Sequence, residues 1–405
     1  MKALKYILLT PLFIALLLLS WNFVASYIIS PVYKFEKPKP FEGSQVYNPY
    51  ESINRESWAR ANFHAHTRVH GGITNGAHNL QDQTWKRYRD LGYDIIGISD
   101  YQSINTYGKD SAGYIPLYEH GYGVGKKHQL VLNAKRVDWF DYPIFQTLDN
   151  KQYMIKRLLE TASAVAIAHP NKSKAYSGEE LSQLAGFRLV EVASTMTRSF
   201  APWDSALTRG RALFMLCNDD CHDISHTHDV GVSYTMVNDV GENPEKTVNA
   251  LLAGQSYGVI TYRPENESMT AKISRTRNEK ILLEKAELRH DTFFVAFNCP
   301  VTEFGLVANG REMPPIQPDS TGKAAAIPFE AGYRYMRITA RTESGAMVIL
   351  NPLFRTIDGS FPDPDLPVAN RFWSAINGGI TLLAGAVLLA LIRRRNKIRK
   401  SINAA

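Results

Sequence analysis

The stretch Asn62-Phe63-His64-Ala65-His66-Thr67-Arg68-Val69-His70 ends a short apolar segment with a His-x-His pattern, and a third histidine follows four residues later. Residues i and i+2 of a β-strand point to the same side of the sheet. His64 and His66 can therefore present two imidazoles to one point, which is what a metal ion requires. Because histidine serves many other roles, the interpretation depends on what the rest of the chain contributes.

Polar residues that can bind metals also stand at the ends of other apolar runs along the chain. They are Asp100, Glu119, His128, His169, Asp220 and His222. In α/β folds the active site lies at the carboxyl ends of the strands, so residues in these positions converge in space. The convergence predicts a metal centre made of histidines and carboxylates.

Between residues 59 and 264, β-like runs alternate with helix-like segments. The β-like runs are Ala61–His64, Asp94–Asp100, Tyr114–Glu119, Gln129–Asn133, Ala164–His169, Arg188–Ala193 and Arg211–Cys217. The helix-like segments are Leu80–Leu91, Lys151–Ser163, Gly178–Leu184 and Asp204–Arg209. Alternation of this kind favours an α/β fold, with a parallel sheet and crossover helices that is either open or closed into a barrel.

The motifs at the run ends resemble those of the polymerase and histidinol phosphatase (PHP) family of metal-dependent hydrolases. They stand in the family's order over about residues 59–240: His64-Ala65-His66, Ser99-Asp100-Tyr101, Glu119 with His128, His169-Pro170, and Asp220-Cys221-His222. The resemblance implies a distorted seven-stranded β/α (TIM-like) barrel. It also implies cleavage of phosphate esters with up to three zinc, manganese or iron ions.

The resemblance also implies a ligand set. One metal would be held by His64, His66, Glu119 and Asp220, and Glu119 would bridge to a second metal held by His128 and His169. Asp100 is a further candidate ligand. Tyr101 stands where the family usually has a histidine for a third metal, and a phenol is a poor neutral ligand. We therefore expect two metals, with His70 and His222 left over for a third.

Two cations roughly 3.5–4 Å apart can share a carboxylate and a water, lower the pKa of that water and clamp the oxygens of the attacked group. We expect Glu119, Asp220 and His222 to be catalytic. Arg68, Lys172 and Arg198 are candidates to bind a substrate anion, or are ordinary loop charges. The leading hypothesis is a phosphoesterase. Hydrolysis of a carboxylic ester or amide, and a non-catalytic binding or assembly protein stabilised by metal, remain as alternatives.

Two apolar runs, Tyr6–Ile29 and Phe372–Ile392, are each long enough to span a bilayer. Lys2 and Lys5 precede the first run, and a cluster of basic residues follows the second. By the positive-inside rule both termini are cytoplasmic, so the intervening chain is periplasmic or at the cell exterior. Such a two-pass membrane protein would act on a small molecule or on a lipid or other cell-envelope ester.

The chain therefore divides into six predicted segments. From 265 to 360 helical periodicity vanishes and alternating runs surround turn signals such as Asn309-Gly310, which predicts a small all-β sandwich domain. The segments are a transmembrane anchor (1–30), a tether (31–58), the hydrolase domain (59–264), the β-sandwich (265–360), a transmembrane helix (372–392) and a basic cytoplasmic tail (393–405).

Composition argues against two other classes of protein. The net charge is +7, but eight basic residues lie in the two tails, which leaves −1 for the rest of the 405 residues and gives no nucleic-acid signal. The three cysteines are too few for a disulfide framework.

Overall fold

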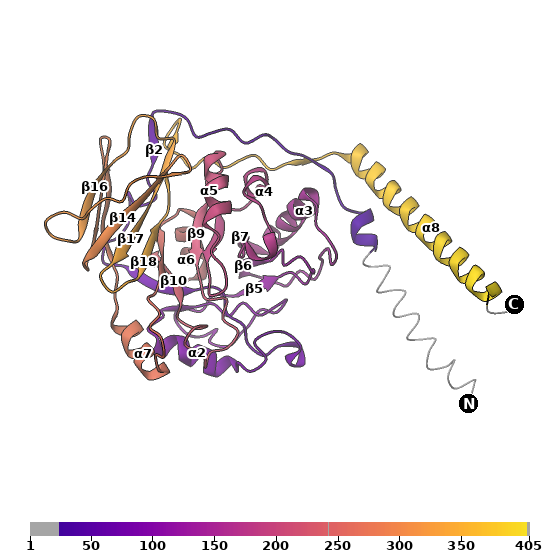
Figure 1. The fold of residues 1–405 in the computed structure, drawn as a ribbon, viewed down its shortest axis with the longest axis horizontal. Coiled ribbons are helices and arrows are strands. Elements are labelled where there is room, and N and C mark those ends of the chain that lie inside the picture. Colours follow the sequence, from indigo (N-terminus) through magenta and orange to yellow (C-terminus); the bar gives the residue numbers. More distant parts are fainter. Residues whose placement is uncertain (1–23, 242, 403–405) are drawn as a thin grey trace.

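A computed structural model describes residues 24–241 and 243–402. It has a globular body of mixed α/β structure, from which the long helix α8 (Arg371–Ile402) extends away (Figure 1). A short helix of residues 24–28 lies beside the first turns of α8. Two contacts join them: Gly378 packs on the carbonyl of Ile28, and just after the short helix the backbone N–H of Val32 donates to Oγ of Ser374.

Each β-like run predicted for the first part of the body overlaps a strand. These strands are β3 (Trp58–Asn62), β4 (Ile95–Ile96), β5 (Leu117–His120), β6 (Gln129–Ala134), β7 (Ala162–Ile167), β8 (Leu189–Ala193) and β9 (Phe214–Cys217). The predicted helices are also present, as α2 (Gln81–Asp90), α3 (Leu148–Leu159), α4 (Gly178–Gln183) and α5 (Phe200–Thr208). Local sequence explains two of them, since Thr147 and Ser177 form capping boxes at the starts of α3 and α4.

These strands do not form the closed barrel that the family resemblance implied. Strands β5-β6-β7-β8-β9 make one open sheet, whereas β3 and β4 lie at the end of a ten-stranded sheet. The edges of the two sheets meet at single bridges, which pair Ala65 with Cys221, Ile96 with Tyr114 and Tyr101 with Glu119. Strand β4 has only two residues, so its hydrogen-bonded pairing ends before Asp100. Regular strand pairing therefore does not close a barrel between β4 and β5.

The five-stranded sheet is only partly parallel. Strand β8 runs parallel to β7 and β9, but β6 is antiparallel to both β5 and β7. An antiparallel strand begins at the edge of the sheet where its neighbours end. The reversal therefore brings His128, at the start of β6, to the same edge as Glu119 and His169.

The ten-stranded sheet continues without a break beyond residue 264, because β11 pairs with β18. Its other strands join in the order β15-β14-β17-β18-β11-β10-β3-β4, with β19 and β2 branching from β17. The strands not yet placed are β2 (Gln45–Tyr47), β10 (Ser233–Asn238), β11 (Ser256–Ile260), β14 (Val301–Ala308), β15 (Arg311–Glu312), β17 (Tyr335–Thr342), β18 (Met347–Leu350) and β19 (Leu353–Thr356). Helix α6 (Pro244–Leu252) connects β10 to β11.

A three-stranded sheet of β12 (Leu283–Arg289), β13 (Thr292–Phe297) and β16 (Ala324–Pro328) shares a core with this large sheet. Phe293 and Phe297 from β13 belong to the same buried cluster as Phe304 and Ile338. Asn309 and Gly310 form the predicted turn, both with positive φ. One expectation for this region is wrong: α7 (Met269–Asn278) is a helix, started by the Ser268 side chain, which accepts from the N–H of Ala271.

The segment 31–58, which we expected to be a tether, lies against the body. Its strand β1 (Tyr33–Lys34) pairs with β20 (Val368–Ala369), and β2 pairs with β19. Phe41 and Tyr50 are buried.

Within residues 24–241 and 243–402, the one helix long and apolar enough to cross a membrane runs from Arg371 to Arg395. The first predicted span lies outside the described residues, except for 24–29.

Candidate metal centre

The ends of β3 and β9 lie side by side, which positions the first ligands. The backbone N–H of Asp220 donates to the carbonyl of His64 at 2.9 Å, and that of His66 donates to the carbonyl of Cys221 at 2.9 Å. His64, His66 and Asp220 are fully buried. Nε2 of His64 and Nε2 of His66 lie 3.1 and 3.3 Å from Oδ1 of Asp220. Two imidazoles and a carboxylate thus converge on one point, as the sequence predicts.

Glu119 lies between this group and a second pair of histidines. Its Oε1 is 2.6 Å from Nδ1 of His128 and 3.0 Å from Nε2 of His169. Its Oε2 is 3.2 Å from Nε2 of His66. Oε1 also lies 3.4 Å from Nε2 of His64, so the two oxygens of this buried carboxylate contact all four histidines, as a bridging ligand would.

The backbone at two of these positions is unusual. His169 and Asp220 have φ angles of 28° and 55°, in a region that residues other than glycine rarely adopt. Such conformations cluster at functional sites, where the surrounding structure has to hold them in place. Here the carbonyl of His64 holds Asp220 in place, and Glu191 accepts from the N–H of His169 at 3.0 Å.

The donor set fits metal ions. Nε2 of His64 and Oε2 of Glu119 are buried atoms that lack a hydrogen-bond partner in the described part of the chain, and leaving such atoms unpaired is costly. Three overlapping groups hold ligand atoms within 4.8 Å of one another: His64–His66–Asp220, Glu119–His128–His169 and His64–His169–Glu191. A divalent cation among these atoms would satisfy them. The mixture of imidazole and carboxylate suits zinc, manganese or iron.

The electrostatics keep both carboxylates ionised. Burial acts to raise the pKa of Glu119, but the imidazoles of His128 and His64 hold it well below its usual range. Burial also opposes ionisation of Asp220, and His64 in particular holds the pKa of that group well below its usual range. Burial alone would lower the pKa of His64. The carboxylates of Asp220, Glu191 and Glu119 outweigh it and hold that pKa well above its usual value. A metal that binds here would displace a proton from His64.

Glu191, in the middle of β8, hydrogen-bonds to candidate ligands of the metal centre and to a neighbouring side chain. Its Oε1 lies 2.9 Å from Nδ1 of His64 and accepts from the side-chain amide of Asn218 at 2.9 Å. Metal-binding histidines commonly donate their second ring N–H to such a carboxylate, which fixes the tautomer. We therefore assign Glu191 to this supporting role. In the sequence its only signal is its place on an apolar run beside the predicted site.

Tyr101 and His222 close one side of the centre. The Tyr101 ring stacks on His66 with a centroid distance of 4.2 Å, and its hydroxyl lies 3.4 Å from Nε2 of His222. Burial and then Glu119 raise the pKa of Tyr101, so the phenol stays protonated. Nδ1 of His222 is 2.7 Å from the carbonyl of Asp220 and must donate to it. Burial, with His66, lowers the pKa of His222 to about 4, so its Nε2 carries a free electron pair at neutral pH.

Asp100 and His70, also predicted as ligands, lie outside the three groups. Both oxygens of Asp100 accept from Thr67, which directly follows His66, and one also accepts from Asn105. Asp100 thus supports the loop that carries His66. His70 is exposed, and its Nε2 lies 2.9 Å from the carbonyl of Tyr101.

Of the three predicted anion-binding residues, Lys172 is at the centre. Its Nζ donates to Oδ2 of Asp220 at 3.1 Å, and a fifth of its side chain is exposed. The guanidinium of Arg198 is turned to the backbone carbonyls of Ser194 and Thr197. Arg68 is exposed.

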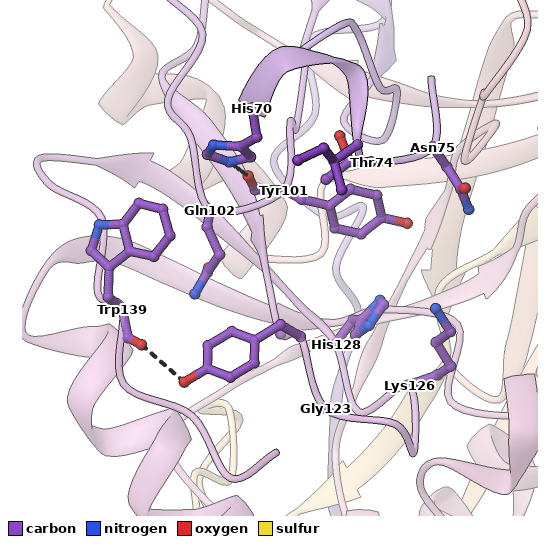
Figure 2. Close-up of a pocket in the computed structure, with 12 residues that line it drawn as sticks. His70, Thr74, Asn75, Tyr101, Gln102, Gly123, Lys126, His128 and Trp139 are labelled. Atoms are coloured by element: carbon purple, nitrogen blue, oxygen red, sulfur yellow. Dashed lines mark hydrogen bonds between the residues drawn. The ribbon is translucent and has the colours of Figure 1, made fainter. Parts of the chain in front are cut away.

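A cavity of about 550 Å³ opens beside the centre. Tyr101 and His128 form its inner wall, and Figure 2 shows Lys126, Trp139 and His70 around it. The cavity joins a mainly apolar and aromatic surface to one cation. A substrate with an anionic group and an apolar or ring-shaped portion matches it.

No protein-family model and no curated protein matches this chain. Among solved structures, a two-domain protein from Bacteroides vulgatus, which contains a predicted PHP-like metal-dependent phosphoesterase, is similar with a TM-score of 0.38 and 13% sequence identity. The alignment covers 82% of this chain and 99% of that one. A likeness at this level assigns neither the fold nor the chemistry of this chain, both of which rest on the residues described above.

Proposed function

We propose that this protein is a metal-dependent phosphoesterase. The observation that carries the proposal is the placement of Glu119, whose two oxygens face His66 on one side and His128 with His169 on the other. A structural role alone would not call for four buried imidazoles around two buried carboxylates, with four of their polar atoms lacking a hydrogen-bond partner among the described residues.

His64, His66 and Asp220 would hold one metal, His128 and His169 would hold the second, and Glu119 would be shared. When bound, two divalent cations supply Lewis acidity and an activated water. Asp220 and Glu119 stay ionised and neutralise the positive charge, and Glu191 keeps the His64 ring turned so that Nε2 faces inward.

Three groups of the chain favour a phosphate ester over an uncharged ester. Lys172 places an ammonium group beside Asp220, and Lys126 places a second cation on the cavity wall. Both can pair with the negative oxygens of a phosphoester. The neutral hydroxyl of Tyr101, which lies 3.4 Å from Nε2 of His222, can turn to donate a hydrogen bond to a substrate oxygen.

Membrane attachment is part of this proposal. Helix α8 has the length and composition of a span, and the basic residues after it favour a cytoplasmic C-terminus. With the first apolar run as a second span, the body lies outside the cytoplasm. Reporter fusions at residue 200 and at the C-terminus would test this arrangement. A reporter at residue 200 that behaves as cytoplasmic would overturn it.

The deciding experiment uses the full chain, purified in detergent, for elemental analysis and for a panel of phosphoesters and carboxylic esters. We expect about two transition-metal ions per chain, and turnover of phosphoesters that is lost on chelation and restored by metal. Turnover of carboxylic esters alone would instead establish an esterase or amidase. Metal without any turnover would establish a metal-stabilised binding protein, and no metal uptake at all would refute the proposal.

A further inference from the structure

Exposed apolar side chains border the mouth of the cavity. Ile73, Tyr122 and Trp139 line the cavity, yet they are 90%, 47% and 60% exposed. Outside it lie Val124, Ile144 and Phe145, at 77%, 65% and 55%. We call these six residues the apolar rim. Apolar groups this exposed and this close together mark a surface that meets something other than water.

All of the rim residues except Ile73 belong to two loops that are hydrogen-bonded to each other, residues 121–127 and 137–147. The hydroxyl of Tyr122 donates to the carbonyl of Trp139 at 3.3 Å, and the N–H of Val124 donates to the carbonyl of Pro143 at 3.0 Å. Asp141 Oδ2 accepts from the N–H groups of Tyr122 and Gly123. The rim is thus a single supported surface, and both loops border the catalytic cavity.

The second of these loops also contacts the membrane-proximal helix 24–28. The hydroxyl of Tyr27 accepts from the N–H groups of Ile144 and Phe145, both at 3.1 Å, and donates to the carbonyl of Phe145 at 3.0 Å. The rings of Tyr27 and Phe145 stack with a centroid distance of 4.7 Å. Helix α3, which begins where this loop ends, lies on the side of the body nearest to helix 24–28 (Figure 1).

The same region reaches α8 itself. A groove of about 370 Å³ is lined by Tyr27, Ile144 and Phe145 together with Asn377 and Thr381 of α8. At the start of α8, Phe372 and Trp373 are 68% and 54% exposed, and aromatic residues at that position are typical of the membrane–water interface. An apolar surface therefore runs from the helix that can span a bilayer to the mouth of the cavity.

We propose that the apolar rim rests in the interfacial layer of the membrane and that the enzyme hydrolyses a phosphoester carried by a membrane lipid. This inference rests on the proposed function. The phosphate group enters the cavity toward Lys126 and Lys172, while the acyl chains stay in the bilayer beside Ile144 and Phe145. In the reaction water supplies a hydroxyl group to phosphorus, the ester P–O bond breaks, and the leaving oxygen takes the proton.

The first test compares two presentations of the substrate with the full chain reconstituted in vesicles. One is a phosphoester lipid in the bilayer, and the other is para-nitrophenyl phosphate in solution. Ile144→Ser should slow hydrolysis of the lipid about five- to tenfold, since it removes most of one apolar side chain that would lie in the bilayer. It should leave hydrolysis of the soluble ester within about twofold. The matched control is Ile357→Ser, whose side chain is 76% exposed and lies outside the rim. It should change neither rate.

The outcomes separate this inference from the proposed function. Hydrolysis of the soluble ester without hydrolysis of any lipid ester would overturn the lipid substrate and leave the phosphoesterase intact. Equal effects of Ile144→Ser on both substrates, or on neither, would overturn the role of the rim. Absence of hydrolysis of both substrates in metal-loaded protein would overturn the function and the inference together.

A second measurement tests the rim without relying on turnover. The partly exposed Cys299 is first changed to Ser, whereas Cys217 and Cys221 are buried and can stay. Spin labels are then attached to Ile144→Cys or Val124→Cys in the full chain in vesicles, and Ile357→Cys is the control. Labels at 144 and 124 should be relaxed preferentially by oxygen, which concentrates in the bilayer, and the label at 357 by a water-soluble nickel complex. Water-like relaxation at 144 and 124 would overturn the inference.

Discussion

Oε1 of Glu191 lies 2.9 Å from Nδ1 of His64, while Nε2 of the same ring lies 3.1 Å from Oδ1 of Asp220. The first contact orients the ring, because a histidine that donates through Nδ1 to a carboxylate turns Nε2 toward Asp220, where Nε2 can bind a metal once the metal has displaced its proton. The same carboxylate accepts from the side chain of Asn218 and the N–H of His169. Glu191 thus holds residues from three strand ends in register without being needed as a ligand.

Glu191→Gln should weaken metal binding by about 10- to 100-fold, the usual cost of losing an outer carboxylate. The amide keeps the size of the side chain but cannot accept from three donors at once. The measurement is a metal titration of the chelated full chain, with circular dichroism to check the fold. Glu179→Gln, at an exposed position in α4, is the matched control. Unchanged affinity in Glu191→Gln would show that His64 is oriented by other contacts.

The bridging carboxylate is tested by comparing two variants. Glu119→Gln keeps the shape of the side chain and removes the charge between the two histidine pairs, so bound cations would repel each other with less compensation. We expect loss of at least one metal and a fall in turnover of about a thousandfold or more. Tyr101→Phe removes only a neutral hydroxyl and should cost less than about tenfold. Full metal and turnover in Glu119→Gln, together with loss of both in Tyr101→Phe, would place the centre around the tyrosine instead.

The candidate ligands that the structure brings together could be predicted because each belongs to a local motif at the end of an apolar run, although Asp100 shares that position and lies outside the groups. Glu191 could be expected beside the site from its place on an apolar run, but its partners could not be predicted, because they depend on which strands become neighbours. Asp219 and Asp220 are adjacent acids, yet Asp219 accepts from the backbone N–H groups of Gly231, Val232 and Ser233 and joins two strands. The sequence alone does not distinguish this structural acid from the ligand beside it.

The fold shows the same limit. Apolar runs located the strands well, and the predicted helix Gly178–Leu184 begins where α4 begins, whereas α3 begins three residues before the predicted Lys151. The reversed direction of β6 and the failure of β4 to continue the ring depend on pairing between distant segments, which no local period encodes. Helix α7 was missed because it is largely polar, and even its buried positions are Lys272 and Thr276.

The role of Lys172 can be separated from that of the metal ligands. Lys172→Met keeps the side-chain stem and removes the ammonium group that contacts Asp220. We expect kcat/KM for a phosphoester to fall about 10- to 100-fold, because one cation facing the phosphate oxygens is lost, while metal content stays unchanged. Lys174→Met, two residues away and exposed, is the control and should behave like the parent. Loss of metal in Lys172→Met would mean that the lysine serves mainly to position Asp220.

The metal-free chain should lose stability in acid partly through His222. Burial lowers the pKa of His222 to about 4, whereas the unfolded chain has the ordinary value near 6.5. Above pH 6.5 the residue is neutral in both states and contributes nothing to the pH dependence. Between about pH 6.5 and 4 only the unfolded state takes up the proton. The free energy of unfolding therefore decreases as the pH is lowered, by about 3 kcal/mol at most.

His222→Asn keeps a donor for the carbonyl of Asp220 and removes the titrating group. The midpoint of thermal unfolding, measured with chelator from pH 7 to pH 4, should therefore decline less steeply in the variant than in the parent. Identical slopes would show that His222 is accessible enough to take up a proton in the folded chain.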